Sequence, residues 1–420
     1  MKRIAVLFTG QGSQYVGMGR KVYEEDAAAR ELFEMASAVL DLDMKTLCFE
    51  GPPEILDQTE NTQPALLLCS VAAYRQFRAR TGLTPVYLAG HSLGELSALV
   101  AAEVLSIEDG LRLARQRGLF MGRCGDRGRL GMHAVTQLAR DQVEAICRAQ
   151  PGYGSEFVIA NYNARSQHVL SGTFAAMERA GQALKKAGAV IIPLKVSGPF
   201  HSPYMAPAAD ALAECIGSLH LSRPKLPVIA NVDARPHGDP GDIAVSLVRQ
   251  LTGAVRWSDS LALLHEEGMD VYLEAGPRGV LKRLVQVNLP GAKAYALDED
   301  DDQRLIDDEF AADLRAMQEQ PSLVTKCMAV AVSTRNQNWN ENQYQQGVVQ
   351  PYRQLQSLQE QLESEARPAS EQECRTALDL LARIFATKGT PVDEREWRYH
   401  QILETTRTTK MLGGYRPNAA

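Results

Sequence analysis

Long apolar runs are missing from this sequence of 420 residues. It has no run of about 18 or more apolar residues, the length that a membrane-spanning helix needs. Its first residues, MKRIAVLFTGQGSQ, lack the extended apolar segment of a signal peptide. We therefore expect a cytoplasmic protein with no membrane partner.

Paired cysteines and an excess of positive charge are also missing. The seven cysteines are scattered without any C-x-x-C pair, at positions 48, 69, 124, 147, 215, 327 and 374. This pattern predicts reduced thiols and no cysteine-based metal site. The net charge of −6 gives no reason to expect a nucleic-acid partner. With 45% hydrophobic and 23% charged residues, the chain is typical of a globular protein of several domains.

One short stretch does carry a chemical signature. Gly90-His91-Ser92-Leu93-Gly94 fits G-x-S-x-G, a tight turn from a strand to a helix that exposes a serine hydroxyl. The preceding residues read as a short buried strand, and Leu93 to Val104 read as a helix rich in Leu and Ala. The free backbone N–H groups at the start of that helix favour a developing oxyanion. Ser92 is the candidate nucleophile.

Apolar strands alternate with helical patterns over much of the chain. IAVLFT near the N-terminus, VYLAG, VIANV and VYLEAG are separated by helical segments, which predicts a doubly wound α/β core with a parallel sheet. Between 128 and 197 the order changes to β-α-β-β-α-β, which predicts a ferredoxin-like α+β insert.

The expected domain organisation follows from these changes. The large core takes residues 1–127 and 198–297, and the insert takes 128–197. Residues 298–309, with eight acids among twelve residues, should form a solvated acidic linker. Residues 310–420 are rich in Gln and Asn and read as a mostly helical C-terminal extension.

A nucleophilic serine needs a base, and the chain offers eight histidines. His91 is adjacent to Ser92, but neighbours on a turn point apart, so we interpret it as a packing or gating residue. His201 follows an apolar strand and the pair Pro199-Phe200, where the insert returns to the core. Because sites form where domains meet, His201 is the predicted base.

Arg117 lies on the apolar face of its predicted helix. The helix that begins near Ser106 has a stripe of Leu113, Arg117, Phe120 and Met121, so a guanidinium interrupts an otherwise apolar face. A buried guanidinium requires an anion. That anion is either a protein carboxylate or a substrate carboxylate held by two parallel hydrogen bonds. The second interpretation predicts a dicarboxylic acyl substrate.

Several segments together resemble the malonyl-CoA:acyl carrier protein transacylase family over residues 1–297. They include FTGQGSQYVGMG, TENTQPALL, GHSLGELSALVAAEVL, RQRGLFM, ANYNARSQHVLSG, VSGPFHSPYM, NVDARP, VRW and LEAGP. The resemblance implies an α/β-hydrolase-like core in which Ser92 is acylated, with His201 as its base. It also implies that a backbone carbonyl just before VRW holds this histidine, and Gly253 stands there.

The same resemblance assigns further site residues. Backbone amides of Gln11 and Leu93 would form the oxyanion hole, and Arg117 would bind the malonyl carboxylate. Phe200 would favour malonyl over branched acyl groups. The remaining positions that line or order the site are Gln63, Met121, Met132 and Asn163.

The implied activity is malonyl transfer from malonyl-CoA to the phosphopantetheine thiol of an acyl carrier protein, with no metal or redox cofactor. The C-terminal extension resembles those of free-standing acyltransferases that serve polyketide synthases, which favours polyketide over fatty-acid synthesis. An acyl hydrolase that uses the same serine and histidine on water is the alternative, and Arg117 argues against it. A lipase-type hydrolase and a non-catalytic scaffold are weaker alternatives.

Overall fold

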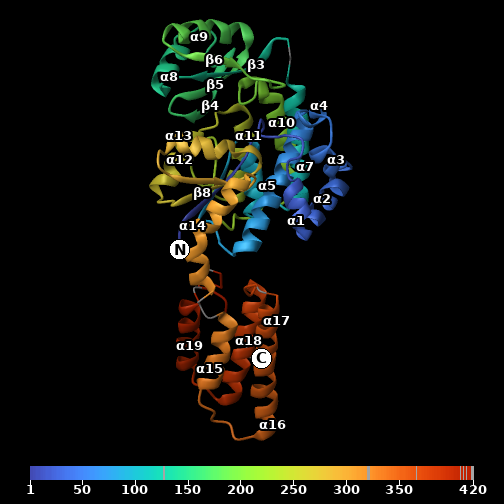
Figure 1. Cartoon of the computed structure of the whole chain (residues 1–420), viewed down its shortest axis with the longest axis vertical. Helices are drawn as coiled ribbons and strands as arrows, with labels where there is room; N and C mark the ends of the chain where they lie inside the picture. The colour runs from blue at the N-terminus through green and yellow to red at the C-terminus, as the bar shows by residue number, and fades with distance from the viewer. Residues whose placement is uncertain are drawn as a thin grey trace. The chain divides into compact units, whose positions relative to one another are not determined.

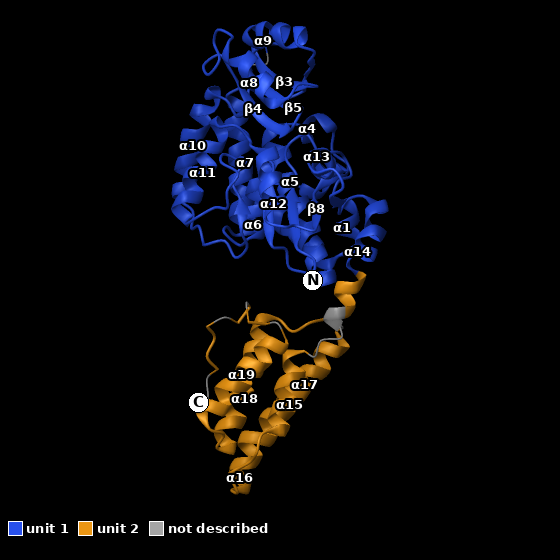
Figure 2. Ribbon diagram, turned by 90° about the vertical axis from the view of Figure 1, so that its left-hand side faces the viewer, with its two compact units in different colours: residues 1–310 blue, residues 311–420 orange. Residues whose placement is uncertain are grey.

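The computed structural model describes residues 1–125, 128–318, 322–365, 367–406, 408–409, 411–412 and 414–417. The chain divides into two compact units, Met1–Phe310 and Ala311–Ala420 (Figure 2). Within the described ranges, no helix is both long enough and apolar enough to cross a bilayer.

A parallel sheet forms the centre of the first unit (Figure 1). Its strands are β1 (Ile4–Phe8), β2 (Tyr87–Gly90), β7 (Val228–Ile229), β8 (Val271–Ala275) and β9 (Lys293–Ala296). They lie in the order β7-β2-β1-β8-β9, and each neighbouring pair is parallel. All five residues of β1 are buried, as expected for a strand covered on both faces.

Helices cover both faces of this sheet. Ala5 and Leu7 pack in one apolar cluster with Trp257, whereas the ring of Phe8 lies 5.6 Å from that of Tyr74 in α5. Alternate residues of a strand point to opposite faces, so these contacts place helices on each side. The helices around the sheet are α1 (Arg20–Glu25), α2 (Ala27–Leu40), α3 (Met44–Phe49), α4 (Pro53–Leu56), α5 (Thr59–Thr81), α6 (Leu93–Ala101), α7 (Ile107–Arg123), α10 (Ala206–Gly217), α11 (Pro240–Thr252), α12 (Trp257–Glu266) and α13 (Val280–Asn288). Short 3₁₀ turns occupy Pro203–Met205 and Pro277–Gly279.

The insert is a small antiparallel sheet with two helices on one face (Figure 1). Its elements are β3 (Leu130–Thr136), α8 (Arg140–Arg148), β4 (Phe157–Ala164), β5 (Gln167–Thr173), α9 (Phe174–Lys186) and β6 (Val190–Pro193). The strand order β4-β5-β3-β6 leaves β4 and β6 at the edges. With the parallel core, this insert confirms the predicted fold class.

The acidic segment 298–309 differs from the expected linker, because it continues into a helix that packs on the first unit. Helix α14 (Asp300–Gln318) has Asp300, Asp301 and Asp302 in its first turn, where carboxylates are favoured by the helix dipole. Asp302 is buried and accepts a 2.6 Å hydrogen bond from Nζ of Lys282. Phe310 is also fully buried. The division between the units therefore falls inside α14 and not at the acidic residues.

The second unit is helical, as the pattern predicts. Its helices are α15 (Leu323–Ser333), α16 (Glu341–Tyr344), α17 (Gln350–Ser364), α18 (Glu371–Lys388) and α19 (Val392–Thr405), with a π-helical turn at Gln345–Val349. Its own apolar core includes Cys327, Leu355, Leu381 and Phe385.

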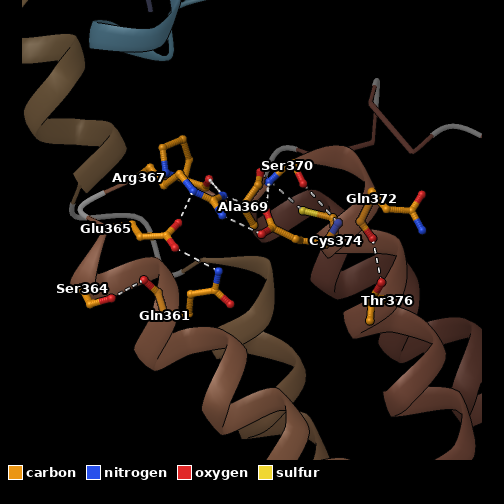
Figure 3. Close-up of polar contacts among 11 residues, drawn as sticks. Gln361, Ser364, Glu365, Arg367, Ala369, Ser370, Gln372, Cys374 and Thr376 are labelled. Atoms are coloured by element: carbon orange, nitrogen blue, oxygen red, sulfur yellow. Dashed lines mark hydrogen bonds and ion pairs between the residues drawn. The ribbon is translucent and has the colours of Figure 1, made fainter. Parts of the chain in front are cut away.

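An ion pair links Arg367 to Glu373 in the first turn of α18 (Figure 3). Both terminal nitrogens of Arg367 donate 2.8 Å hydrogen bonds to the carboxylate of Glu373. Glu373 also forms a capping box with Ser370. The Arg367 hydrogen bond is the main cause that lowers the pKa of Glu373 to about 2. Since the pair is partly exposed, it adds little to the stability of the unit.

Candidate active site

Ser92 lies on a strained turn between β2 and α6. Its backbone has φ 53° and ψ −106°, a conformation that L-residues rarely adopt. A Cβ on Gly90 would lie 1.9 Å from the carbonyl carbon of Gly94, and one on Gly94 would lie 2.0 Å from the carbonyl oxygen of Phe8. Both glycines of G-x-S-x-G are therefore required sterically, and the turn is the predicted strand-to-helix elbow.

His201 reaches Ser92 across 109 residues of sequence. Its Nε2 lies 2.8 Å from Ser92 Oγ, and its Nδ1 lies 2.8 Å from the carbonyl oxygen of Gln250. A carbonyl only accepts hydrogen bonds, so Nδ1 carries the proton in this arrangement and Nε2 is free to accept from the hydroxyl.

The carbonyl that orients His201 corrects one expectation. The resemblance implies Gly253, but the 2.8 Å partner is the carbonyl of Gln250, one helical turn earlier near the end of α11. Gly253 is only the lesser of the two backbone carbonyls that raise the pKa of His201. The last turn of a helix leaves its carbonyls without intrahelical partners, which frees the Gln250 oxygen for this bond.

The environment of His201 keeps the imidazole neutral. Burial is the largest cause and the nearby Arg117 charge the second, and together they lower the pKa of His201 to about 3. A neutral imidazole with Nε2 facing the serine hydroxyl is in the state that a general base requires.

Arg117 is buried beside the serine. Only 4% of the residue is exposed, and Nη2 donates to Ser92 Oγ at 3.2 Å. The guanidinium also donates to the side-chain oxygens of Gln63 and Gln250, at 2.8 and 2.7 Å. Among the described residues, no carboxylate pairs with it directly. Burial therefore lowers the pKa of Arg117 to about 10, and the more distant charge of Glu95 opposes that shift.

The buried carboxylate of Glu95 contacts Gln250 on the side away from Arg117's guanidinium donors, and the sequence analysis did not identify it. Oε2 of Glu95 accepts from Nε2 of Gln250 at 2.8 Å and from the amide of Asn231 at 2.9 Å. Oε1 of Glu95 lies 2.9 Å from Nε2 of His237. The side chain of His237 is only 2% exposed, so this contact is buried.

Gln250 could have been found by the argument used for Arg117. It lies on the buried stripe of α11 with Ile243, Ser246 and Leu247. An amide on a buried helical stripe must find buried hydrogen-bond partners, just as a guanidinium must. Glu95 could have been found in the same way, since it is a carboxylate in α6 among buried Leu, Ala and Val residues. Asn231 gave no comparable signal, because it lies in a turn after β7.

The oxyanion hole expected from the resemblance consists of the backbone amides of Gln11 and Leu93. The amide of Ser92 itself is engaged, since it donates to Oδ1 of Asn231 at 2.7 Å. No acceptor in the described part of the chain is assigned to the amide of Leu93, the first residue of α6, or to that of Gln11. The side chain of Gln11 donates to Thr59 Oγ1 at 3.2 Å, which holds the loop after β1 in place.

Two other predicted residues contact neighbours of Ser92 and not Ser92 itself. Gln63 bonds Arg117 directly, and its Nε2 lies 3.4 Å from the sulfur of Met121. Asn163 bonds His91 at 2.8 Å and not Ser92. The ring of His91 packs 5.6 Å from that of Trp257, which fits its interpretation as a packing residue.

Phe200 and Met132 are both buried. Phe200 directly precedes His201. Met132 lies in β3 of the insert, where its carbonyl accepts from the amide of Leu194.

Comparison with known proteins identifies the family. The acyl transferase domain model matches residues 6–298. A malonyl CoA-acyl carrier protein transacylase of Bacillus subtilis strain 168 is 41% identical over 287 residues, which is 68% of this chain and 90% of that protein. A second transacylase of the same name from Bacillus subtilis is 33% identical over 405 residues, covering 96% of this chain and all of that protein. That second match extends into the C-terminal unit.

A solved structure gives the same result. It contains a type II polyketide synthase acyl carrier protein in complex with its malonyl-transacylase. The similarity has a TM-score of 0.69 and 37% identity, over 73% of this chain and 98% of that one. With the strand-to-helix serine, the parallel core and the small insert, these matches are decisive. The chain belongs to the malonyl-CoA:acyl carrier protein transacylase family of acyltransferases.

Proposed function

We propose that this S-malonyltransferase moves malonyl from malonyl-CoA to the phosphopantetheine thiol of an acyl carrier protein, with Ser92 and His201 as the catalytic pair. One observation carries the choice of acyl group. Arg117 places a buried guanidinium 3.2 Å from Ser92 Oγ, with only neutral acceptors bonded to it among the described residues. A free carboxylate on the acyl group is the charge that this site lacks.

In the first half of the reaction, Ser92 Oγ attacks the thioester carbon of malonyl-CoA. His201 Nε2 takes the hydroxyl proton as the new C–O bond forms. The tetrahedral oxyanion then collapses, the C–S bond breaks, and the CoA sulfur leaves with the proton from His201. The Gln250 carbonyl stabilises the imidazolium that exists between these two proton transfers.

In the second half, the carrier thiol gives its proton to His201 and attacks the malonyl-serine ester. Collapse of this second tetrahedral species releases Ser92, which recovers its proton from His201. Ping-pong kinetics follow from this sequence. Every proton and electron pair is accounted for by Ser92, His201 and the two thiols, so the reaction requires no metal or redox cofactor.

The amides of Gln11 and Leu93 would stabilise the oxyanion in both halves. The amide of Ser92 is already bonded to Asn231. Preorganised amides are effective because they need no reorganisation as the charge develops.

Selection of malonyl would combine charge and shape. The Arg117 fork would bind the carboxylate, while Gln63 holds the guanidinium in place. Phe200, Met121 and Met132 would limit the space for an α-branch, and a hydrophobic wall discriminates against one methyl group by only roughly 10–200-fold. Asn163 would act indirectly, by fixing His91.

We place the reaction in polyketide synthesis. The relative that matches 96% of this chain shares the C-terminal unit, whereas the match to the strain 168 protein covers 68% of the chain. An acyltransferase with an added unit suits a pathway in which the enzyme must find particular carrier proteins. The C-terminal sequence resembles extensions of free-standing polyketide acyltransferases, which supports the same assignment.

Intact-mass measurement tests the function directly. Incubation with malonyl-CoA should add one malonyl group to the wild-type enzyme, and a holo carrier protein should then remove it and gain the same mass. Rapid loss of malonyl to water without transfer would instead establish the acyl hydrolase alternative.

A further inference from the structure

Asn231 holds the strained turn at Ser92 from both of its ends. Its Oδ1 accepts a 2.7 Å hydrogen bond from the Ser92 amide, and its Nδ2 donates at 2.7 Å to the carbonyl oxygen of Gly90. The residue lies in the turn after β7 and is 1% exposed. A serine with φ 53° and ψ −106° keeps that conformation only where its surroundings enforce it. Asn231 therefore helps to fix the backbone that carries the nucleophile.

The partners of two amide side chains define how each amide is oriented. Arg117 can only donate, so the Gln250 side-chain oxygen faces the guanidinium and the Gln250 nitrogen faces away from it. That nitrogen donates to the Ser92 carbonyl oxygen at 3.0 Å and to Oε2 of Glu95 at 2.8 Å. In the same way, the Ser92 amide can only donate, which assigns the oxygen of Asn231 to that side. Both amides therefore have one defined orientation.

Glu95 is the group that Asn231 and Gln250 share. It lies in the first turn of α6, three residues after Ser92, and is 0% exposed. Its Oε2 accepts from the backbone amide of Asn231 at 2.9 Å as well as from Gln250. Its Oε1 faces Nε2 of His237 at 2.9 Å, a nitrogen that can also donate. A buried carboxylate requires hydrogen-bond donors around it, and these three nitrogens supply them.

Two routes lead from Glu95 to the reacting groups. The first passes through Asn231 to the backbone of Ser92, which every acyl group uses. The second passes through Gln250 to Arg117, which only an acyl group with a carboxylate uses. Among the contacts of the described residues, none joins the Glu95 side chain to Ser92 Oγ or to His201. Any effect of Glu95 on the reaction therefore acts through these routes.

We propose that Glu95 is a positioning residue whose carboxylate, through hydrogen bonds, fixes Asn231 at the Ser92 turn and Gln250 at Arg117. One buried carboxylate thereby sets both the rate of acylation and the preference for malonyl. This inference rests on the proposed function, because the second route matters only if Arg117 binds the malonyl carboxylate.

Glu95→Met and Glu95→Gln form a matched pair of variants. Methionine has a similar length and no oxygen, whereas glutamine keeps one oxygen that can accept from both Asn231 and Gln250. Acylation of Ser92 by malonyl-CoA and by acetyl-CoA is followed by rapid quench and intact mass. Glu95→Met should slow acetyl acylation roughly tenfold and malonyl acylation roughly 100-fold, because loss of a hydrogen bond to a charged group costs about tenfold or more on each route. Glu95→Gln should retain most of the wild-type rate with both substrates.

Variants of the two partners separate the routes. Asn231→Ala removes the first, so malonyl and acetyl acylation should fall by the same factor, through the maximal rate and not through the acyl-CoA concentration at half-maximal rate. Gln250→Leu removes the second, so malonyl acylation should fall more than acetyl acylation. Glu103→Met is the matched control, because the Glu103 side chain just after α6 is 63% exposed. This control should acylate like wild type, and circular dichroism establishes that each variant is folded.

Several results would overturn the proposal. An equal loss in Glu95→Gln and Glu95→Met would mean that the negative charge matters and not the hydrogen bonds. If Glu95→Met lowers both substrates by the same factor, the route to Arg117 is absent, and if it lowers malonyl alone, the route to Ser92 is absent. Wild-type rates in Glu95→Met would eliminate both routes.

The partner variants decide the matter if Glu95→Met does not fold. An unchanged acetyl rate in Asn231→Ala would then refute the route to Ser92, and an unchanged ratio of malonyl to acetyl acylation in Gln250→Leu would refute the route to Arg117. Failure of the wild type to form malonyl-Ser92 at all would instead refute the proposed function.

Discussion

The side-chain oxygen of Gln250 accepts a 2.7 Å hydrogen bond from Nη2 of Arg117. The main-chain oxygen of the same glutamine bonds Nδ1 of His201 at 2.8 Å. One residue of α11 therefore orients both the proposed carboxylate-binding group and the proposed base. Its side-chain oxygen serves the first and its backbone serves the second, while its side-chain nitrogen also donates to the Ser92 carbonyl and to Glu95. Substitution of the side chain leaves the backbone role in place.

Gln250→Leu should weaken malonyl transfer much more than acetyl transfer. The substitution removes an acceptor of the buried Arg117 and the donor to Glu95 and the Ser92 carbonyl, but it leaves the carbonyl that holds His201. Loss of a hydrogen bond to a charged group costs about 1.5–3 kcal/mol, or roughly 10–100-fold in rate. Acylation rates with malonyl-CoA and acetyl-CoA measure the effect. Gln63→Leu, which removes the other side-chain acceptor, should give the same selectivity change, and equal losses for both substrates would contradict this role.

Arg117→Ala should lower malonyl transfer by about two to four orders of magnitude. A malonyl carboxylate would be desolvated without its partner, and breaking such a buried pair costs about 3–5 kcal/mol. Acetyl transfer should hold steady or rise, since it makes no use of the guanidinium. Lysine should rescue only partly, because it lacks the two-pronged geometry. If acetyl and malonyl transfer fall together in steady-state assays, Arg117 is a structural residue.

Ser92→Ala should abolish the acyl-enzyme and leave the fold intact. The hydroxyl contacts only His201 and Arg117 among the described residues, so its removal costs little packing. His201→Ala should slow acylation by orders of magnitude, since the serine loses its base. Intact mass after mixing with malonyl-CoA, together with circular dichroism, tests both variants. Loading at the wild-type rate by either one would refute the proposed pair.

The pH dependence should reflect the low pKa of His201. Its pKa in the folded protein, about 3, lies below the ordinary 6.5, so the stability that a neutral buried imidazole provides is present above pH 6.5. That stability should be lost as the pH falls from 6.5 towards 3. Because the Arg117 charge contributes to the shift, Arg117→Gln should raise the pKa of His201. Titration of the His201 ring by NMR in both proteins measures it, and an unchanged pKa would show that burial alone sets the value.

Removal of the second unit should leave a folded first unit if α14 is kept. A chain ending at residue 318 should still load malonyl on Ser92, because the proposed catalytic residues precede it. A chain ending at residue 297 loses Ile306 and Phe310, which are fully buried. Each contributes roughly 1.5–3 kcal/mol by burial, so this shorter chain should unfold at a lower temperature. Thermal melts and malonyl loading of the two chains provide the measurement. Equal melting temperatures would mean that the start of α14 adds nothing to the first unit.

Much of this architecture could be predicted from local patterns. The G-x-S-x-G turn, the parallel core and the β-α-β-β-α-β insert each depend on residues close together in sequence. Arg117 was found for the same reason, since a cation on an apolar helical stripe is visible within a few turns. The helical extension was equally clear from its periodicity.

The structure of the acidic segment could not be predicted from its local composition. Composition alone favoured a solvated linker over residues 298–309. The structure places Asp302 against Lys282 and buries Ile306 and Phe310, contacts that the charge pattern does not reveal.

The sequence by itself selected Ser92, His201 and Arg117 as candidates, because the steric need at a turn, the seam between insert and core and the polarity of a helix face can all be read from neighbouring residues. Only the tertiary structure decided which groups orient them. The carbonyl that bonds His201 belongs to Gln250 and not to Gly253. Glu95 and His237, which are far apart in the sequence, form a buried contact behind Gln250. Hydrogen bonds between distant elements depend on how helices and strands pack, and no spacing along the chain encodes those distances.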